Sequence, residues 1–257
     1  MTTAPPPKKS DLGVRTASAV VMIAVAGSAL WLGGYWWTAF VAAVALGVLW
    51  EWWGLVRGLA KSPLARLVWS VAGVIYIGLA AATLIFLRFL PFGLALLIVL
   101  VGAIIATDVG AYFAGRTIGG PKIAPSISPS KTWAGLGGAI LAVALCLVMS
   151  ALLWTRLQEP DYMQDTYYLV ASPGVWLILP VLIALIAQSG DFFESWMKRR
   201  AGVKDSGNLI PGHGGLFDRV DGLLAVVFCV ALVFLAPLAM STQNHKQSRP
   251  KFEMIDQ

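Results

Sequence analysis

Charged side chains are scarce in this chain, at 12% of its 257 residues against 58% hydrophobic ones. A soluble domain has about a quarter of its residues charged, so this composition excludes a soluble globular protein. Cysteine is almost absent as well, with Cys146 and Cys229 each lying inside an apolar segment. They have no closely spaced partners of the kind that indicates a disulfide framework or a cysteine-based zinc site. We expect both to be small core residues.

Two common nucleotide-binding motifs are also missing. The chain has neither a G-x-x-x-x-G-K-[ST] loop nor a strand-associated G-x-G-x-x-G loop, which excludes the soluble folds built on them. No stretch between the apolar segments is long enough to bury a core of its own. We therefore expect one polytopic domain without an appended soluble domain.

Long uncharged segments are abundant instead. They cover residues 16–50, 67–87, 89–107, 132–155, 166–190 and 222–244. Each can cross a bilayer, because roughly 20 apolar residues span the hydrocarbon. The first segment is long enough for two helices and should fold back at Gly33-Gly34. The sequence thus predicts an all-α membrane protein with about seven transmembrane helices; an eighth span or a re-entrant segment remains an alternative.

The two ends of the chain differ from its middle. Residues 1–15 are basic and proline-rich and predict a disordered cytoplasmic tail, and residues 241–257 predict a polar C-terminal tail. The first apolar segment is too long for a signal peptide and lacks a convincing cleavage site, so we expect it to be retained. Residues 16–240 then form a single transmembrane domain.

The distribution of Lys and Arg predicts the orientation, because positive loops remain on the cytoplasmic side. Basic residues lie in the N-terminal tail and in loops at 57–66, 116–131 and 198–204, whereas the alternate loops carry few. These basic loops should face the cytoplasm. A seven-span count leaves the basic residues of the C-terminal tail on the other side, which is why the eighth span remains open.

Acidic residues gather where the predicted spans reach the cytoplasmic side. They are Asp108, Asp191, Glu194, Asp205, Asp218 and Asp221. Carboxylates at membrane depth are costly unless they face a cation, a polar cavity or a partner. Their position therefore indicates a functional site.

Residues 195–221 concentrate this polar chemistry. Asp191 and Glu194 share one helix face, and Asp218 and Asp221 share another. The Gly-Pro-rich segment 211–215 between them cannot continue a helix, so a hairpin should bring the two faces together. Carboxylate oxygens in this arrangement suit Mg²⁺, which also takes phosphate and water ligands.

Basic residues surround the predicted metal site. They are Lys198, Arg199, Lys204 and Arg219, and such groups bind phosphate. Each one alone could be a topology signal, and His213 alone could be a hydrogen-bonded loop residue. The combination favours a site for a divalent cation and a polyphosphate.

A second polar segment runs from Thr107 to Trp133. Asp108 and Tyr112 lie four residues apart on one helix face, and a basic loop rich in Ser, Gly and Pro leads to Lys131. The start of the following helix could hold a phosphate beside Lys131. A flexible basic connector is the alternative interpretation.

These motifs resemble the signature of the phosphatidate cytidylyltransferases. The matching pattern is Ser195-x-x-Lys198-Arg199, Lys204-Asp205 and Pro211-x-His213-Gly214-Gly215-x-x-Asp218-Arg219-x-Asp221. Segments 107–133 and 188–194 are also similar to that family. The chain departs from it at Ser130, where a Lys is usual, and at Ala134, where an acid is common.

The resemblance implies transfer of CMP from CTP to phosphatidate, which gives CDP-diacylglycerol and pyrophosphate in phospholipid biosynthesis. It implies Asp191, Asp218 and Asp221 as metal ligands, with Lys198 and Arg219 as further catalytic groups. Phosphate-binding roles fall to Lys131, Lys198, Arg199, Lys204, His213 and Arg219. The expected cofactor is Mg²⁺, with a second, monovalent ion as an option.

The resemblance also predicts the setting. The partners should be CTP, phosphatidate and the lipid bilayer, with no nucleic acid, and the protein should be a homodimer in the bacterial inner membrane. A cytidylyltransferase for another lipid phosphate remains an alternative, as does a cation-coupled transporter. The transporter would place acids near the bilayer midplane, whereas here they gather at one side.

Overall fold

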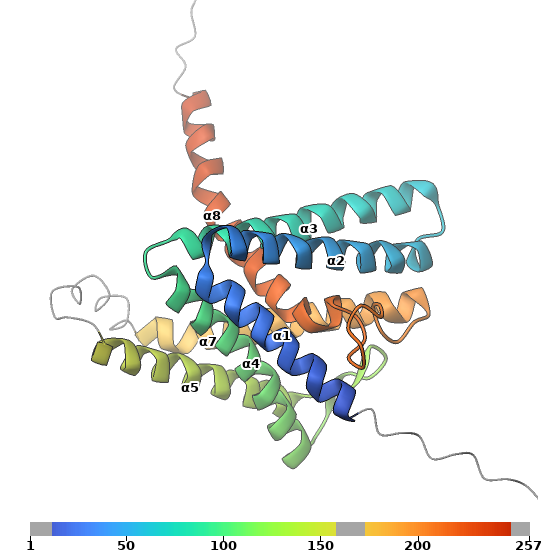
Figure 1. The fold of residues 1–257 in the computed structure, drawn as a ribbon, viewed down its shortest axis with the longest axis horizontal. Coiled ribbons are helices and arrows are strands. Elements are labelled where there is room, and N and C mark those ends of the chain that lie inside the picture. Colours follow the sequence, from blue (N-terminus) through green and yellow to red (C-terminus); the bar gives the residue numbers. More distant parts are fainter. Residues whose placement is uncertain (1–11, 158–172, 248–257) are drawn as a thin grey trace, which may run out of the picture.

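The computed structural model describes residues 12–157 and 173–247, without the side chains of 173 and 237–247. The described helices are α1 (Leu12–Leu32), α2 (Gly34–Leu59), α3 (Pro63–Phe89), α4 (Gly93–Thr117), α5 (Trp133–Leu157), α7 (Pro173–Ala201) and α8 (Phe217–Gln247). All seven contain a segment long and apolar enough to cross a membrane, which confirms the all-α polytopic prediction (Figure 1). Most of both predicted tails and the 158–172 connection lie outside the described residues.

The long first apolar segment divides at Gly33, as predicted. Gly33 and Gly34 both have positive φ angles, of 65° and 50°, which glycine adopts without steric cost. The side chain of Arg88 closes this turn, because its Nε donates to the Leu30 carbonyl at 3.0 Å. A cation at the end of α1 suits the exposed carbonyls and the helix dipole there. Arg88 therefore has a structural role.

The basic connector between α4 and α5 is more ordered than expected. It forms an antiparallel hairpin of β1 (Lys122–Ala124) and β2 (Ser128–Thr132). Thr132 ends the hairpin and begins α5, because its Oγ1 accepts from the Gly135 amide at 3.0 Å. This side-chain cap satisfies one of the free amides of the helix. It also fixes the adjacent Lys131 at the junction of the hairpin and α5.

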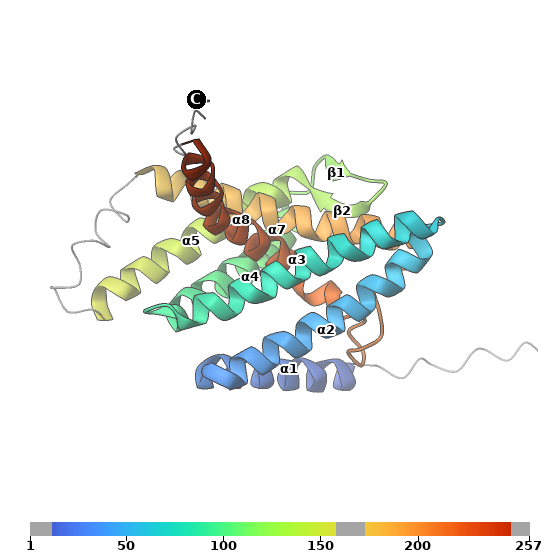
Figure 2. The same ribbon diagram turned by 90° about the horizontal axis from the view of Figure 1, so that it is seen from above.

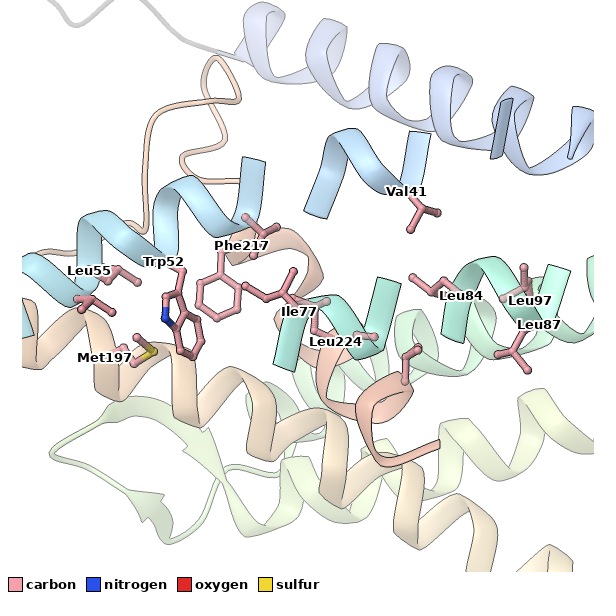
Figure 3. Close-up of a cluster of buried hydrophobic side chains, with 14 of the residues drawn as sticks. Val41, Trp52, Leu55, Ile77, Leu84, Leu87, Leu97, Met197, Phe217 and Leu224 are labelled. Carbon is pink, nitrogen blue, oxygen red and sulfur yellow. The ribbon is translucent and has the colours of Figure 1, made fainter. Parts of the chain in front are cut away.

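A core of large apolar side chains joins α2, α3, α7 and α8 (Figure 3). Trp52 lies near its centre, with ring centroids of Phe193 and Phe217 5.9 and 5.8 Å away. The indole Nε1 of Trp52 donates to the Trp69 carbonyl at 2.9 Å, so its polar atom is satisfied inside the core. This packing holds the first turn of α8 against α2.

Glycines allow two pairs of helices to approach closely. A Cβ added at Gly138 of α5 would lie 2.3 Å from Ala114 Cβ and 2.6 Å from the Gly110 carbonyl oxygen of α4. A Cβ added at Gly190 of α7 would lie 2.5 Å from the Asp221 carbonyl oxygen of α8. Small residues at such contacts let the backbones pack, as in other membrane helix pairs.

The polar loops lie together at one end of the helix bundle. Figures 1 and 2 show the β-hairpin, the α2–α3 turn and the α7–α8 loop at the same end as the start of α1. Contacts agree with this view, since Gly58 near the end of α2 adjoins Ala201 at the end of α7. The loops predicted to share one side therefore share one end of the bundle.

The α4–α5 contact predicts an effect for a single methyl group. Gly138→Ala should lower the free energy of unfolding by about 1–3 kcal/mol, because its Cβ would overlap α4. Thermal unfolding of the purified protein in detergent measures this. Gly137→Ala is the control, since its Cβ would meet nothing within 4 Å. Equal melting temperatures for the two variants would contradict the close contact.

Candidate functional site

The predicted hairpin consists of α7, loop 202–216 and α8. Its two helices cross where Gly190 meets Asp221 and Ala225, and where a Cβ on Gly222 would be 3.2 Å from the Ala187 carbonyl oxygen. Asp191 follows the first of these glycines and Asp221 precedes the other. The close crossing therefore places both carboxylate-bearing residues beside the point where the helices meet.

Lys198 connects two carboxylates near the loop end of the hairpin. Its Nζ lies 2.6 Å from Glu194 Oε2, one helical turn away on α7, and also contacts Asp218 Oδ1 on α8. The Glu194 side chain is only 1% exposed, and those of Lys198 and Asp218 are 14% and 10% exposed. The single ammonium group is thus shared by two largely buried acids.

The second oxygen of Asp218 organises the loop. Asp218 Oδ2 accepts from the Ser206 amide at 2.9 Å and from the Gly215 amide at 3.0 Å, and it lies 2.9 Å from the Ser206 hydroxyl oxygen. Backbone amides directed at one oxygen stabilise a carboxylate strongly. Both ends of the loop are therefore tied to the first turn of α8.

Asp191 belongs to a separate cluster. Its Oδ2 lies 2.6 Å from Lys131 Nζ at the end of the β-hairpin, and its Oδ1 accepts from the Ser195 hydroxyl at 3.3 Å. Asp108 and Asp221 both lie close enough to interact electrostatically with Asp191 and with Lys131. The Lys131 ammonium is thus a cation among three carboxylates from α4, α7 and α8.

The three predicted metal ligands are therefore divided between two clusters. Within residues 12–157 and 173–247, no three His, Cys, Asp or Glu side chains are grouped as a complete metal site. Asp191 and Asp221 nevertheless fit Mg²⁺, which usually takes one or two carboxylates and completes its shell with phosphate and water. Asp218 fits less well, because its side chain is 10% exposed and its oxygens contact Lys198, Ser206 and Gly215. The Asp191 side chain is instead 34% exposed and, among the described residues, its oxygens contact only Lys131 and Ser195.

The predicted phosphate-binding residues differ in their surroundings. Arg219 donates from Nη2 to the His213 carbonyl at 2.7 Å, and His213 Nδ1 lies 2.8 Å from Ser18 Oγ on α1. Both residues thus contribute to the shape of the loop. Arg199 and Lys204 are exposed, and neither forms an ion pair within the described part of the chain. They are therefore accessible to an anionic ligand.

Glu51 on α2 is a site residue that the sequence analysis did not identify. Its carboxylate accepts from Ser206 Oγ at 2.8 Å and from the amides of Leu216 and Phe217 at 2.9 and 2.8 Å. The available signal was its position after the 35-residue uncharged segment 16–50. Asp108 and Asp191 likewise follow directly on uncharged segments, 89–107 and 166–190.

Comparison with known proteins identifies the family. A model of the Cytidylyltransferase family matches residues 52–236, which include the end of α2, the β-hairpin, α7 and the first part of α8. The chain belongs to this cytidylyltransferase family. The matched region also contains every residue predicted for the site from Lys131 to Asp221.

Several similar cytidylyltransferases are named phosphatidate cytidylyltransferase. The protein of Brucella abortus biovar 1 (strain 9-941) is 34% identical over 280 residues, with 90% of this chain and 97% of the relative covered. The protein of Rickettsia bellii (strain RML369-C) is 33% identical over 219 residues, with 84% and 88% covered. The similarity thus extends over nearly the whole length of these relatives.

The shared ammonium group predicts the stability of a Lys198 variant of this cytidylyltransferase. Lys198→Met should lower the free energy of unfolding by about 3–5 kcal/mol, because Glu194 and Asp218 lose their buried partner. Chemical unfolding in detergent measures the loss.

Two further variants test the cause of that loss. Arg199→Met removes an exposed charge next to Lys198 and should change stability by less than about 1 kcal/mol. The double variant Lys198→Met/Glu194→Gln should recover part of the stability, since it removes one unpaired charge. A Lys198→Met protein as stable as Arg199→Met would show that the ion pairs have little structural importance.

Proposed function

We propose that this protein is a phosphatidate cytidylyltransferase that transfers CMP from CTP to phosphatidate and releases CDP-diacylglycerol and pyrophosphate. The observation that carries the proposal is the α7–α8 hairpin, where two acid–base clusters meet at one end of a helix bundle. Relatives named phosphatidate cytidylyltransferase that align over about nine-tenths of the chain support the same reaction.

The reaction requires positioning and charge neutralisation above all. A phosphate monoester oxygen of phosphatidate attacks the α-phosphorus of CTP, a new P–O–P bond forms, and the bond to pyrophosphate breaks. The monoester is already a competent nucleophile at neutral pH, so no strong general base is needed. Enzymes accelerate such a step by holding the reactants in line and stabilising the charge on the leaving group.

The chain's own side chains divide this work. Arg199 and Lys204 are exposed at the loop and suit the triphosphate, while Lys131 stands among the carboxylates of the second cluster. Arg219 and His213 keep the loop in shape. Asp191 and Asp221 would hold Mg²⁺, with Asp108 beside them. When bound, this ion neutralises phosphate charge during the transfer.

The location follows from the same reasoning. We propose that the end with the basic loops faces the cytoplasm of a bacterial cell, in accordance with the positive-inside rule and with the site of CTP supply. The protein would thus lie in the inner membrane, with the phosphatidate headgroup entering from the cytoplasmic leaflet. The acyl chains would remain between the helices.

From the family resemblance we also propose that the protein forms a homodimer and that it binds a second, monovalent cation. Helices rich in Gly and Ala, such as α4 and α5, allow close contacts between copies. Carboxylates outside the Asp191 cluster, such as Glu194, offer oxygen ligands of the kind a monovalent ion accepts.

A direct assay tests the activity. Proteoliposomes with the purified protein, phosphatidate and labelled CTP should form CDP-diacylglycerol and pyrophosphate. Chelation of divalent cations should stop the reaction and Mg²⁺ should restore it. Asp218→Ala should lower kcat at least about 100-fold, because the loop and Lys198 lose their common anchor.

The matched control is Lys61→Met in the exposed α2–α3 turn, which should retain wild-type kcat. Polyprenyl phosphate in place of phosphatidate tests the alternative lipid substrate. Wild-type protein that makes no CDP-diacylglycerol, or a fully active Asp218→Ala variant, would refute the proposal.

A further inference from the structure

Glu51 is a buried carboxylate on α2. It is distant from the 195–221 motif in sequence but contacts it directly in the structure. The residue is 3% exposed and is separated from its three hydrogen-bond donors by 155 to 166 residues. No ion pair involves Glu51 within the described residues. Its charge is thus balanced by hydrogen bonds from the loop and from the start of α8.

The contacts of Glu51 occupy both carboxylate oxygens. Oε1 accepts from the Leu216 amide, and Oε2 accepts from the Phe217 amide and the Ser206 hydroxyl. The first amides of any helix lack partners within the helix, and a carboxylate there also suits the helix dipole. Glu51 therefore caps α8 from a neighbouring helix rather than from the preceding residues of the chain.

Two glycines make room for this carboxylate. A Cβ added at Gly207 would lie 2.4 Å from Glu51 Oε1, and one added at Gly215 would lie 2.7 Å from Glu51 Oε2. Neither glycine has a positive φ angle, so their requirement is space rather than backbone conformation. The loop thus folds tightly over Glu51 from both sides.

Further contacts extend along the same face of α2. A Cβ at Gly47, one turn before Glu51, would lie 2.8 Å from Leu216 Cδ2, and one at Gly58 would lie 3.0 Å from Ala201 Cβ. The end of α7, the loop and the start of α8 thus all rest on α2. Glu51 is the polar centre of this contact.

Ser206 links Glu51 to Asp218. Its hydroxyl lies 2.8 Å from Glu51 Oε2 and 2.9 Å from Asp218 Oδ2, and its amide donates to the same Asp218 oxygen. Asp218 in turn contacts Lys198. A displacement of Ser206 or of the first turn of α8 would therefore move Asp218 and Lys198 together.

We propose that Glu51 is a positioning residue for the transfer reaction. It fixes loop 202–216 and the start of α8 on α2, and thereby sets the place of Asp218. The proposal deepens the function proposed above and rests on it for its kinetic part. Its structural part, the capping of α8, can be measured without any substrate.

The first experiment compares Glu51→Gln with wild type by hydrogen exchange of the backbone amides. Gln has one acceptor oxygen and cannot accept from both Leu216 and Phe217 while it also contacts Ser206. Exchange at whichever of Leu216 and Phe217 loses its acceptor should therefore rise about tenfold. Core amides of α3 should exchange as in wild type, which shows that the fold is intact.

The second experiment measures kinetics in proteoliposomes with CTP and phosphatidate. Glu51→Gln should lower kcat about 10- to 100-fold, as removal of groups that orient a catalytic site does, while KM for CTP changes less than about threefold. Glu51→Asp keeps both acceptor oxygens and should recover part of kcat. A purely structural role would instead reduce the amount of folded enzyme and leave kcat per folded molecule unchanged.

Trp37→Phe is the matched control on the same helix. It removes a buried tertiary hydrogen bond, from Trp37 Nε1 to the Leu84 carbonyl at 3.0 Å, about 21 Å from Glu51 along the helix axis. It should leave exchange at Leu216 and Phe217 and kcat unchanged.

The outcomes separate the two proposals. Unchanged exchange and unchanged kcat in folded Glu51→Gln would overturn the positioning role. Faster exchange in that variant, with no CDP-diacylglycerol formed by wild type, would uphold the capping role and refute the proposed reaction. If Glu51→Gln fails to fold, Ser206→Ala serves instead, since it removes the link to Asp218. Wild-type kcat in Ser206→Ala would likewise overturn the positioning role.

Discussion

Charge withdrawn from water must be balanced inside the protein, and this requirement shapes the polar end of the helix bundle. Glu194 is nearly inaccessible, and it is acceptable there because Lys198 lies against it and against Asp218. Asp191 has Lys131, and Glu51 has amides and a hydroxyl. The contacts of Lys198 with Asp218, of Lys131 with Asp191 and of Glu51 with the start of α8 each join two segments of the chain. Together they connect α2, β2, α7 and α8.

Close helix contacts complement these polar links. The contact of Gly190 with α8 and the contact of Gly138 with α4 bring backbones together, where a side chain would hold them apart. The first contact sets the spacing between Asp191 and Asp221. The aromatic core around Trp52 also packs against Phe217 at the start of α8 (Figure 3). The positions of the charged side chains in the site therefore depend on the packing of the helices around it.

The sequence predicted the fold well because its signals were local. Uncharged segments defined the spans, and Gly33-Gly34 defined a turn whose backbone requires glycine. The α7–α8 hairpin followed from acids at helical spacing and a Gly-Pro-rich break. The β-hairpin was not predicted, because Ser, Pro and Lys in 122–132 are as typical of a loop as of short strands, and pairing of the two segments decides between them.

The site was predicted only in part, for a physical reason. Spacing shows which residues share a helix face, but it does not show which carboxylate oxygens are already bound by amides and ammonium groups. Asp218 and Asp191 therefore looked equivalent in the sequence, although Asp218 organises a loop and Asp191 faces Lys131. The position of Glu51 after segment 16–50 indicates a functional acid, but its role does not follow from the sequence, because its partners lie more than 150 residues away. Only the tertiary structure brings them together.

That separation along the chain has a consequence for biosynthesis. Ser206 and Phe217 are made 155 and 166 residues after Glu51, so at about 5–20 residues per second the ribosome delivers them roughly 8–30 s later. During this interval α2 can enter the bilayer with its carboxylate near the surface and in contact with water. The last hairpin then meets a helix already in place, and the polar end of the enzyme is completed only when the final span arrives.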